Sequence, residues 1–85
     1  MQTGSVVISL KGHDKGQVYV VTKYENKECF ICNGKQKKLE NPKKKNTKHL
    51  KDTGVKIELS SYNPLYDAHI RKEIKSLCVE KINCL

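Results

Sequence analysis

Apolar residues in this chain come in short alternating runs that are separated by glycines and other turn-forming residues. Val6 and Ile8, and then Val18 and Val20, repeat at every second position, which is the period of a strand with one buried side. No apolar stretch is longer than five residues, whereas a membrane-spanning helix requires about 20. The pattern therefore predicts a small, mainly β domain and excludes a membrane-spanning helix.

Turn-forming residues divide the first part of the chain into expected strands. These strands are expected at 5–10, 17–23 and 29–32, with the polar loop KGHDKG and a turn at 25–27 between them. In the first run, Val6, Ile8 and Leu10 are expected on the buried side and Val7 on the other. In the second run, Val18 and Val20 are expected on one face of the sheet.

The dipeptide Asn33-Gly34 is typical of a two-residue hairpin turn, because both positions of that turn take positive φ. We therefore expect a fourth strand at 35–40 that pairs back on the third strand. Asn41-Pro42 would end that strand, and the lysines at 43–45 would lie in the loop beyond it.

The second half of the chain changes from strand patterns to a helical one. Leu50 is expected to anchor a short fifth strand or 3₁₀ turn at 48–51, and alternation at 55–59 indicates one more short strand. Asn63 and Pro64 suit the N-cap and first position of a helix. Its apolar residues at helical spacing are Tyr66, Ile70, Ile74, Leu77 and Leu85, with Lys81 between the last two. The expected organisation is a barrel at 1–61 and a helical extension at 62–85 that packs on it.

Positive charge is concentrated in one segment. The chain has 17 Lys and Arg against 9 Asp and Glu, for a net charge of +8. Residues 35–51 hold eight lysines and one acid, Glu40, and therefore carry +7 of that charge. Clustered like charges repel one another unless a counter-anion relieves them, so the segment favours an anionic partner such as nucleic acid or an acidic membrane surface. A flexible lysine-rich loop that only keeps the protein soluble is the alternative.

The four cysteines allow a metal site to be considered. Cys29 and Cys32 have Cys-x-x-Cys spacing, and Cys78 with Cys84 could complete a zinc site of four thiolates. On an extended strand, however, positions three apart face opposite sides, so the first two thiols should diverge. The chain start lacks the pattern of a secretion signal, so we expect a cytoplasmic protein with reduced cysteines, of which Cys29 and Cys32 are apolar core residues, and no metal.

Catalytic patterns are not found in the sequence. It has no Gly-x-Ser-x-Gly, no Walker loop and no His-Glu-x-x-His. The three histidines, His13, His49 and His69, fall in different expected elements. A barrel this small is filled by its own side chains, so we expect neither an enzyme nor a cofactor, and His13 and His49 are expected to face phosphate or solvent.

The polar loop has the composition of an anion site. Gly12 and Gly16 allow the backbone to approach a phosphate closely, beside the ammonium groups of Lys11 and Lys15. Asp14 is expected to brace the loop through an Asx-type hydrogen bond. A plain hairpin turn is the alternative reading of the two glycines.

Residues 4–21, GSVVISLKGHDKGQVYVV, resemble a KOW motif: a strand, a loop with a glycine, a Lys-Gly pair at the end of the loop and an apolar return strand. Downstream, Asn33-Gly34, the lysine-rich residues 35–38, LENPKKK at 39–45 and Lys48-His49-Leu50 are similar to bacterial KOW-domain RNA-binding proteins. Those proteins are related to large-subunit ribosomal proteins of archaea and eukaryotes. The similarity covers about residues 4–51, with a weaker echo at 69–74.

This resemblance implies an SH3-like five-stranded barrel that binds RNA, expected to be ribosomal, without enzymatic activity. The chain departs from the family pattern at Cys29 and Cys32, where aliphatic residues are more typical, and after Gly54. The departures leave the barrel prediction unchanged and affect only the tail.

Lysine exceeds arginine by 16 to 1, and lysine binds phosphate as a point charge whereas arginine makes the bidentate contacts that read bases. The expected binding is therefore to phosphates and RNA shape, with weak sequence preference. Tyr19, Tyr24 and Phe30 are the candidates for base stacking, although strand positions favour packing instead.

The sequence thus predicts a non-catalytic RNA-binding protein, a monomer when free, that binds ribosomal RNA, with ribosomal proteins as further partners. The alternative is an SH3-like protein-interaction module in the translation or transcription machinery. The residues expected to contact RNA are Lys11, Gly12, His13, Lys15, Gly16, Lys35, Lys37, Lys38, Lys43, Lys44, Lys45, Lys48, His49 and Lys51.

Overall fold

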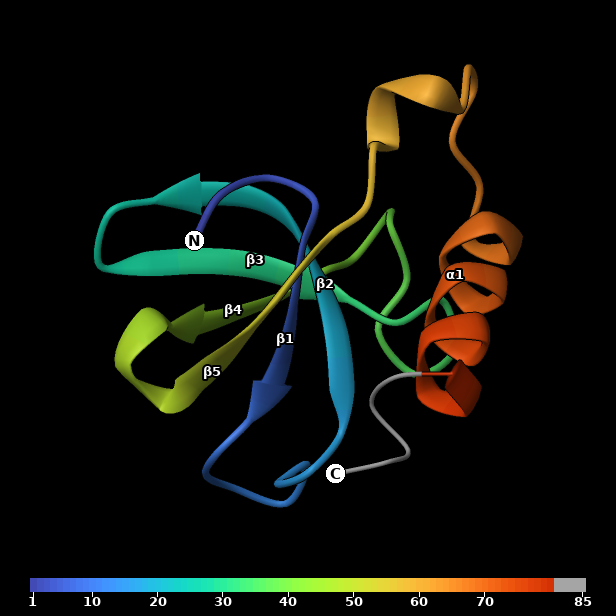
Figure 1. Ribbon diagram of the computed structural model, residues 1–85. Helices are drawn as coiled ribbons and strands as arrows, with labels where there is room; N and C mark the ends of the chain where they lie inside the picture. The colour runs from blue at the N-terminus through green and yellow to red at the C-terminus, as the bar shows by residue number, and fades with distance from the viewer. Residues whose placement is uncertain (81–85) are drawn as a thin grey trace.

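In the computed structural model, which describes residues 1–80, the chain forms one antiparallel sheet of five strands followed by one α-helix (Figure 1). The elements are β1 (Ser5–Ser9), β2 (Val18–Glu25), β3 (Glu28–Cys32), β4 (Lys43–Asn46), η1 (Thr47–His49), β5 (Leu50–Lys56), η2 (Leu59–Ser61) and α1 (Asp67–Glu80). The strand order is β4-β3-β2-β1-β5, so the last strand returns to pair with the first. The mainly β class with a C-terminal helix is confirmed, and the curled sheet gives a small barrel-like fold.

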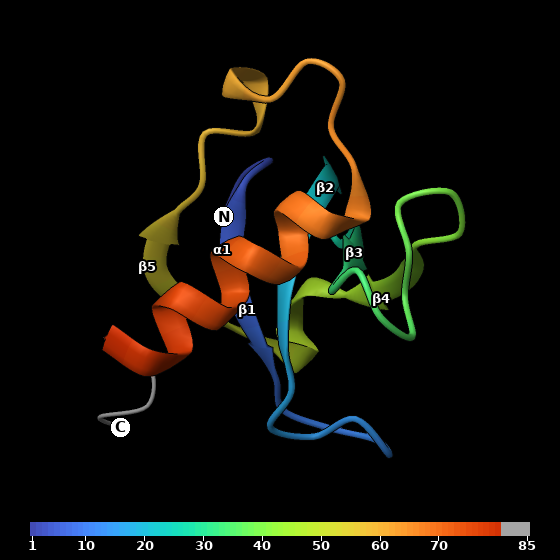
Figure 2. The same cartoon turned by 90° about the vertical axis from the view of Figure 1, so that its right-hand side faces the viewer.

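Both faces of the sheet are buried, because the curled sheet encloses one face and α1 covers the other (Figure 2). The first cluster, here called the barrel core, contains Val7, Tyr19, Val21, Cys29, Ile31 and Leu50. The second, here called the helix core, contains Val6, Val20, Cys32, Ile57 and Ile70. The alternating pattern of β2 is confirmed, since neighbouring residues of that strand belong to different clusters.

The prediction that β1 has only one buried face is wrong. Val6 and Val7 are both fully buried, one in each core, and Ser9 is buried as well. Leu10, expected on the buried side, lies just beyond the strand and is 42% exposed. The pattern of β1 alone does not reveal that a helix distant in sequence covers its second face.

The predicted fourth strand at 35–40 is wrong, because residues 33–42 form a loop between β3 and β4. Gly34 takes the positive φ expected of a turn, 76°, but the loop closes on Lys37 instead of starting a hairpin. The amides of Asn33 and Gly34 donate to the Lys37 carbonyl at 2.9 and 3.1 Å. The Asn33 side chain accepts from the amides of Lys35 and Lys37 at 2.9 and 3.1 Å. These bonds satisfy the backbone locally, so it does not pair with β3.

The strand that pairs with β3 is instead the lysine triplet, which the sequence had placed in a loop. β4 aligns Lys43, Lys44 and Lys45 with Ile31, Phe30 and Cys29 respectively. The connection between the two strands is therefore ten residues long instead of two, since β3 ends at Cys32 and β4 begins at Lys43.

The expected 3₁₀ turn and strand near Leu50 are confirmed as η1 and β5, and Leu50 is buried in the barrel core. The separate strand predicted at 55–59 is not formed, because β5 already extends to Lys56. The chain then leaves the sheet: the amide of Ile57 donates to the Gly4 carbonyl at 2.8 Å, and η2 follows.

The helix begins at Asp67, three residues later than predicted from Pro64. Leu65, in the loop before the helix, packs against the helix core. The first turn is closed by the Tyr66 amide, which donates to Nδ1 of His69 at 3.0 Å. His69, at the third helical position, accepts this bond as the corresponding side chain does in a capping box.

Packing of α1 on the sheet matches the expected apolar stripe in part. Ile70 is fully buried, whereas Ile74 and Leu77 are half-buried in the helix core. Tyr66 is 60% exposed, and the predicted positions Lys81 and Leu85 lie outside the described residues. Within residues 1–80, no helix has the length and apolarity needed to cross a membrane.

Candidate nucleic-acid interface

The buried carboxylate of Asp14 joins the loop at 10–17, here called the glycine loop, to the lysine-rich strand β4. Oδ1 of Asp14 accepts hydrogen bonds from Lys45 Nζ at 2.9 Å and from the Ser9 hydroxyl at 3.0 Å. Its Oδ2 accepts from Lys43 Nζ and the Tyr19 hydroxyl, both at 2.9 Å. The four donors come from β1, β2 and β4, so the loop at 10–17 is held directly against β4.

The strand period determines which lysines reach Asp14. Lys43 and Lys45 lie opposite Ile31 and Cys29, which belong to the barrel core, so their stems run along the inner face of the barrel. Lys44 faces outward and forms a solvent-exposed pair with Glu28, Nζ to Oε1 3.4 Å. The three consecutive lysines therefore have two different environments.

The ion pairs control the charge of this junction. Burial by itself would raise the pKa of the Asp14 carboxyl, but the hydrogen bonds from Lys43 and Lys45 outweigh it and hold that pKa well below its usual range. Burial, and then the hydrogen bond to the Asp14 carboxylate, raises the pKa of Tyr19 to about 12. Asp14 is therefore ionised at neutral pH, and Tyr19 remains a proton donor to it.

Lys45 is a structural lysine. Only 9% of its side chain is exposed, and its ammonium also donates to the Ser9 hydroxyl at 2.6 Å and to the Lys11 carbonyl at 2.8 Å. Lys43 is less enclosed, with 33% of its side chain exposed. The charge of segment 35–51 is thus partly compensated by Asp14, contrary to the expectation of an uncompensated run.

The glycine loop is compact and rigidly bonded. Gly12 and Gly16 have φ of 92° and 89°, in the region that other residues rarely adopt. The Gly16 amide, expected to face a phosphate, instead donates to the Ser9 carbonyl at 2.8 Å. Asp14 braces the loop, but through side chains of neighbouring strands and not through the expected Asx-type bond. Of the loop groups expected to bind phosphate, the side chains of Lys11, His13 and Lys15 are exposed.

The short turn η1 adds basic groups beside this loop. The His49 carbonyl accepts from the Leu10 amide at 2.8 Å, which places Lys48 and His49 next to the loop. The pKa of His49 is lowered by partial desolvation and then by the charges of Lys11, Lys48 and Lys45. His49 is therefore a neutral hydrogen-bonding group at neutral pH, and Lys48 and Lys51 are exposed cations.

The remaining predicted residues lie in a second group on the 33–42 loop. Lys35 and Lys38 are exposed, and Lys37 is half-buried. This loop is fixed to α1, because the guanidinium of Arg71 donates to the Gly34 carbonyl at 2.6 Å and the Leu39 amide donates to Oδ1 of Asp67 at 2.8 Å. The two groups meet at a hollow of about 310 Å³. Its lining residues are His13, Asp14, Gln17, Tyr19, Gln36, Lys37 and Lys43.

Sequence reasoning missed two groups of residues at this surface. Gln17 and Gln36 line the hollow, and the exposed Arg71 and Lys75 of α1 extend the basic surface beside the 33–42 loop. The weak similarity at 69–74 was the signal that could have pointed to Arg71. The glutamines have no pattern of their own, because only the fold places them together.

The two central cysteines lie on opposite faces of the sheet, as predicted. Cys29 is in the barrel core and Cys32 in the helix core, both fully buried. Burial raises the pKa of Cys29, and burial followed by the charge of Asp67 raises that of Cys32 to about 12. Their thiols cannot share one metal ion. Among residues 1–77, whose side chains the structure describes, no cluster of His, Cys, Asp and Glu is placed to hold a metal; the side chains of the other two candidates, Cys78 and Cys84, lie outside that range.

The aromatic candidates for base stacking occupy different environments. Tyr19 is buried in the barrel core, Phe30 is half-buried with Lys23 Nζ 5.8 Å from its ring centroid, and Tyr24 is 41% exposed. A separate stack of Tyr62 on His69, with ring centroids 4.4 Å apart, lies near the start of α1. The connection between η2 and α1 is at the opposite end of the molecule from the glycine loop (Figures 1 and 2).

No protein-family model matches the chain, and no curated protein matches it either. The resemblance to KOW proteins therefore stays a prediction, and the function has to be argued from the geometry.

Proposed function

We propose that the protein is a non-catalytic RNA-binding module that docks on structured RNA, with ribosomal RNA as the expected partner. The observation that carries this proposal is the Asp14 junction, which holds the glycine loop against β4. It gathers cationic side chains from three separate segments on one surface. They are Lys11 and Lys15 of the glycine loop, Lys43 of β4, and Lys48 of η1, which the backbone bond between Leu10 and His49 places next to the loop.

The chemistry of this surface suits phosphates better than bases. Its cations are lysines, which act as hydrated point charges and do not form the planar bidentate contacts of arginine. The bonds of the loop at 10–17 are already made before a ligand arrives, so little conformational entropy is lost on docking. Such a surface binds RNA through the spacing of its phosphates, with weak dependence on sequence.

The test is the salt dependence of binding to a folded ribosomal RNA fragment, followed by fluorescence anisotropy. For about four to six phosphate contacts, each contributes about −0.7 to −0.9 to the slope of log affinity against log salt. Lys15→Gln and Lys48→Gln should each make the slope less steep by about one contact. Lys56→Gln is the matched control, because Lys56 pairs with Ser5 at the other end of β1. An affinity that does not change with salt would contradict the proposal.

A protein-interaction module in the translation or transcription machinery is the alternative function. Peptide recognition by a small barrel uses an exposed aromatic groove. Of the three strand aromatics, Tyr24 is exposed, while Tyr19 is buried and bonded to Asp14. The alternative would be favoured if the protein failed to bind RNA but a Tyr24→Ala change abolished its association with ribosomes.

A further inference from the structure

We propose that a cleft between the glycine loop, the 33–42 loop and α1 holds one unpaired nucleotide of the bound RNA. This inference rests on the proposed function and adds to it a preference for RNA that carries an unpaired nucleotide. The cleft consists of two hollows that share Gln17 and Gln36 among their lining residues. We call it the amide cleft, after these two side chains.

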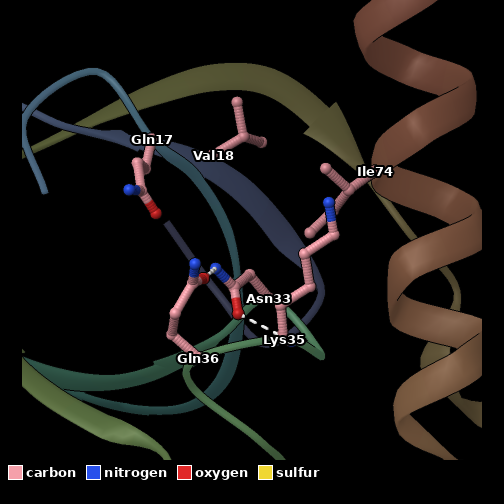
Figure 3. A pocket seen from close by; sticks show the side chains of 6 residues that line it. All are labelled: Gln17, Val18, Asn33, Lys35, Gln36 and Ile74. Carbon is pink, nitrogen blue, oxygen red and sulfur yellow. Dashed lines mark hydrogen bonds between the residues drawn. The ribbon is translucent and has the colours of Figure 1, made fainter.

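The two ends of the amide cleft are similar in size and differ in their lining. The first hollow, of about 300 Å³, is lined by the six residues drawn in Figure 3. Its apolar members, Val18 of β2 and Ile74 of α1, are both half-buried. The second, of about 310 Å³, includes His13, Lys37 and Lys43. Each hollow is at the lower end of the range for small-ligand sites, large enough for a base but not for a double helix.

One polar side chain of the cleft, that of Gln36, is positioned by Asn33, which is buried. Its Nδ2 donates to Oε1 of Gln36 at 3.0 Å, and its Oδ1 is occupied by two loop amides. Gln36 is thereby oriented with its carbonyl bonded and its amino group left for a ligand. Gln17 extends toward Gln36 from the other side of the hollow (Figure 3), and its only side-chain bond within residues 1–80 is a long one, 3.5 Å from the Tyr19 hydroxyl.

This arrangement matches the chemistry of a single nucleotide. Side-chain amides offer a donor and an acceptor to the edge of a base, and bases of unpaired nucleotides are the ones that proteins reach in RNA. The apolar surface of Val18 and Ile74 can lie against the face of the base. Lys35 beside the first hollow, and Lys37 and Lys43 beside the second, can bind the phosphates on either side. A base-paired segment would present its phosphates to the same lysines but could not fill the cleft.

The test compares RNA hairpins that are identical except for one bulged nucleotide, with each of the four bases in turn. At one fixed salt concentration, we expect at least one bulged hairpin to bind about five- to tenfold more tightly than the bulge-free hairpin, as for one or two net hydrogen bonds. The double change Gln17→Leu with Gln36→Leu should abolish that preference, so that bulged and bulge-free hairpins bind with about equal affinity. Its binding to the bulge-free hairpin and the salt slope should stay unchanged.

One control variant and one single cleft variant separate a loss of the cleft from a loss of folding. Gln2→Leu alters an exposed glutamine outside the cleft and should retain the full preference. Gln17→Leu alone breaks only the long bond to Tyr19, so it tests the cleft if circular dichroism shows that the double variant is unfolded. It should lower the preference about two- to threefold.

The possible outcomes test the amide cleft and the proposed function separately. Equal binding of all hairpins by the unaltered protein would overturn the amide cleft and leave the proposed function intact. A bulge preference that survives the double change would overturn the assignment to this cleft. Binding of free adenosine monophosphate as tightly as the bulged hairpin would also overturn it, because the cleft would then serve a free nucleotide. Failure to bind any hairpin would overturn both proposals.

Discussion

Asp14 is the residue on which the candidate surface depends. It is an acid within a strongly basic protein, and it accepts hydrogen bonds from two lysines, a serine and a tyrosine. A buried carboxylate is stable only when its charge is paired and its lone pairs are bonded. Both conditions are met here, so Asp14 links three strands and orders the loop that carries Lys11 and Lys15.

Asp14→Asn should therefore destabilise the protein by about 2–3 kcal/mol at pH 7, because two charge-assisted bonds lose their anion. The folded pKa of Asp14 lies below its unfolded value, so its stabilisation is complete above about pH 5 and is lost as pH falls below about 4. The difference in unfolding free energy between the two proteins should shrink accordingly. Urea unfolding at pH 7 and at stepwise lower pH measures it.

Asp52→Asn is the control for this prediction. Asp52 pairs with the N-terminal ammonium at 3.5 Å, and 38% of its side chain is exposed, so its loss should cost less than about 1 kcal/mol. An Asp14→Asn protein as stable as the original at pH 7 would show that the junction contributes nothing to the fold.

At the scale of elements, β4 shows how strand geometry assigns different roles to identical residues. From the sequence alone, Lys43, Lys44 and Lys45 are equivalent positive charges. Pairing with β3 turns Lys44 outward and the other two toward Asp14. A surface lysine contributes mainly to ligand binding, whereas an enclosed and fully bonded lysine contributes mainly to stability.

Lys44→Gln and Lys45→Gln should consequently differ in their effect on the unfolding free energy. Lys45→Gln should lower the unfolding free energy by about 2 kcal/mol, because the Asp14 carboxylate loses an enclosed partner. Lys44→Gln should change it by less than about 0.5 kcal/mol, because its pair with Glu28 is solvent-exposed. Urea unfolding of both variants measures the difference. Equal stability of the two variants would contradict the assignment.

For the molecule as a whole, the central fact is that one sheet separates two cores. The barrel core contains Cys29, and the helix core contains Cys32. The helix core depends on α1, which contributes Ile70, fully buried between the helix and the sheet. The helix is thus part of the folded domain's packing, and it also fixes the 33–42 loop through Arg71.

Ile70→Ala should cost about 3–4 kcal/mol, in the range for a large buried aliphatic side chain. Because α1 then covers its face less tightly, Cys32 should react faster with a thiol reagent while Cys29 stays protected. Peptide mass mapping of the labelled protein distinguishes the two sites. Leu77→Ala, at a half-buried position of the same helix, should have a smaller effect. Labelling of both thiols at the same rate would mean that the two cores open together.

Much of the strand content could be read from the sequence, because alternation and turn residues are local properties. The strands at 17–23 and 29–32 and the turn between them were predicted close to their observed positions. The errors concern the second buried face of β1, residues 33–46, the separate strand expected at 55–59 and the helix start. Two of them show the cause. There the outcome depends on bonds between side chains and backbone, as at Asn33, or on a contact with a remote core, as at Leu65.

The candidate site was predicted in its parts but not in its arrangement. The glycine loop and the lysine segment were both identified, since charge and glycine are visible in composition. Their connection through Asp14 was not identified, because the bond from Lys43 spans 29 residues of sequence. The same holds for Gln17 and Gln36, which meet only where two loops approach each other.

The small β domain, the helix after its strands, the two central cysteines that face apart and the concentrated charge could all be predicted from the amino-acid order. Those properties follow from side-chain period and composition, which need no knowledge of distant contacts. Three other properties are visible only in the folded chain: the burial of both faces of the sheet, the lysines with a structural role, and the position of the cleft. The reason is that burial and ion pairing depend on residues that the chain brings together from far apart, and local patterns carry no information about those partners.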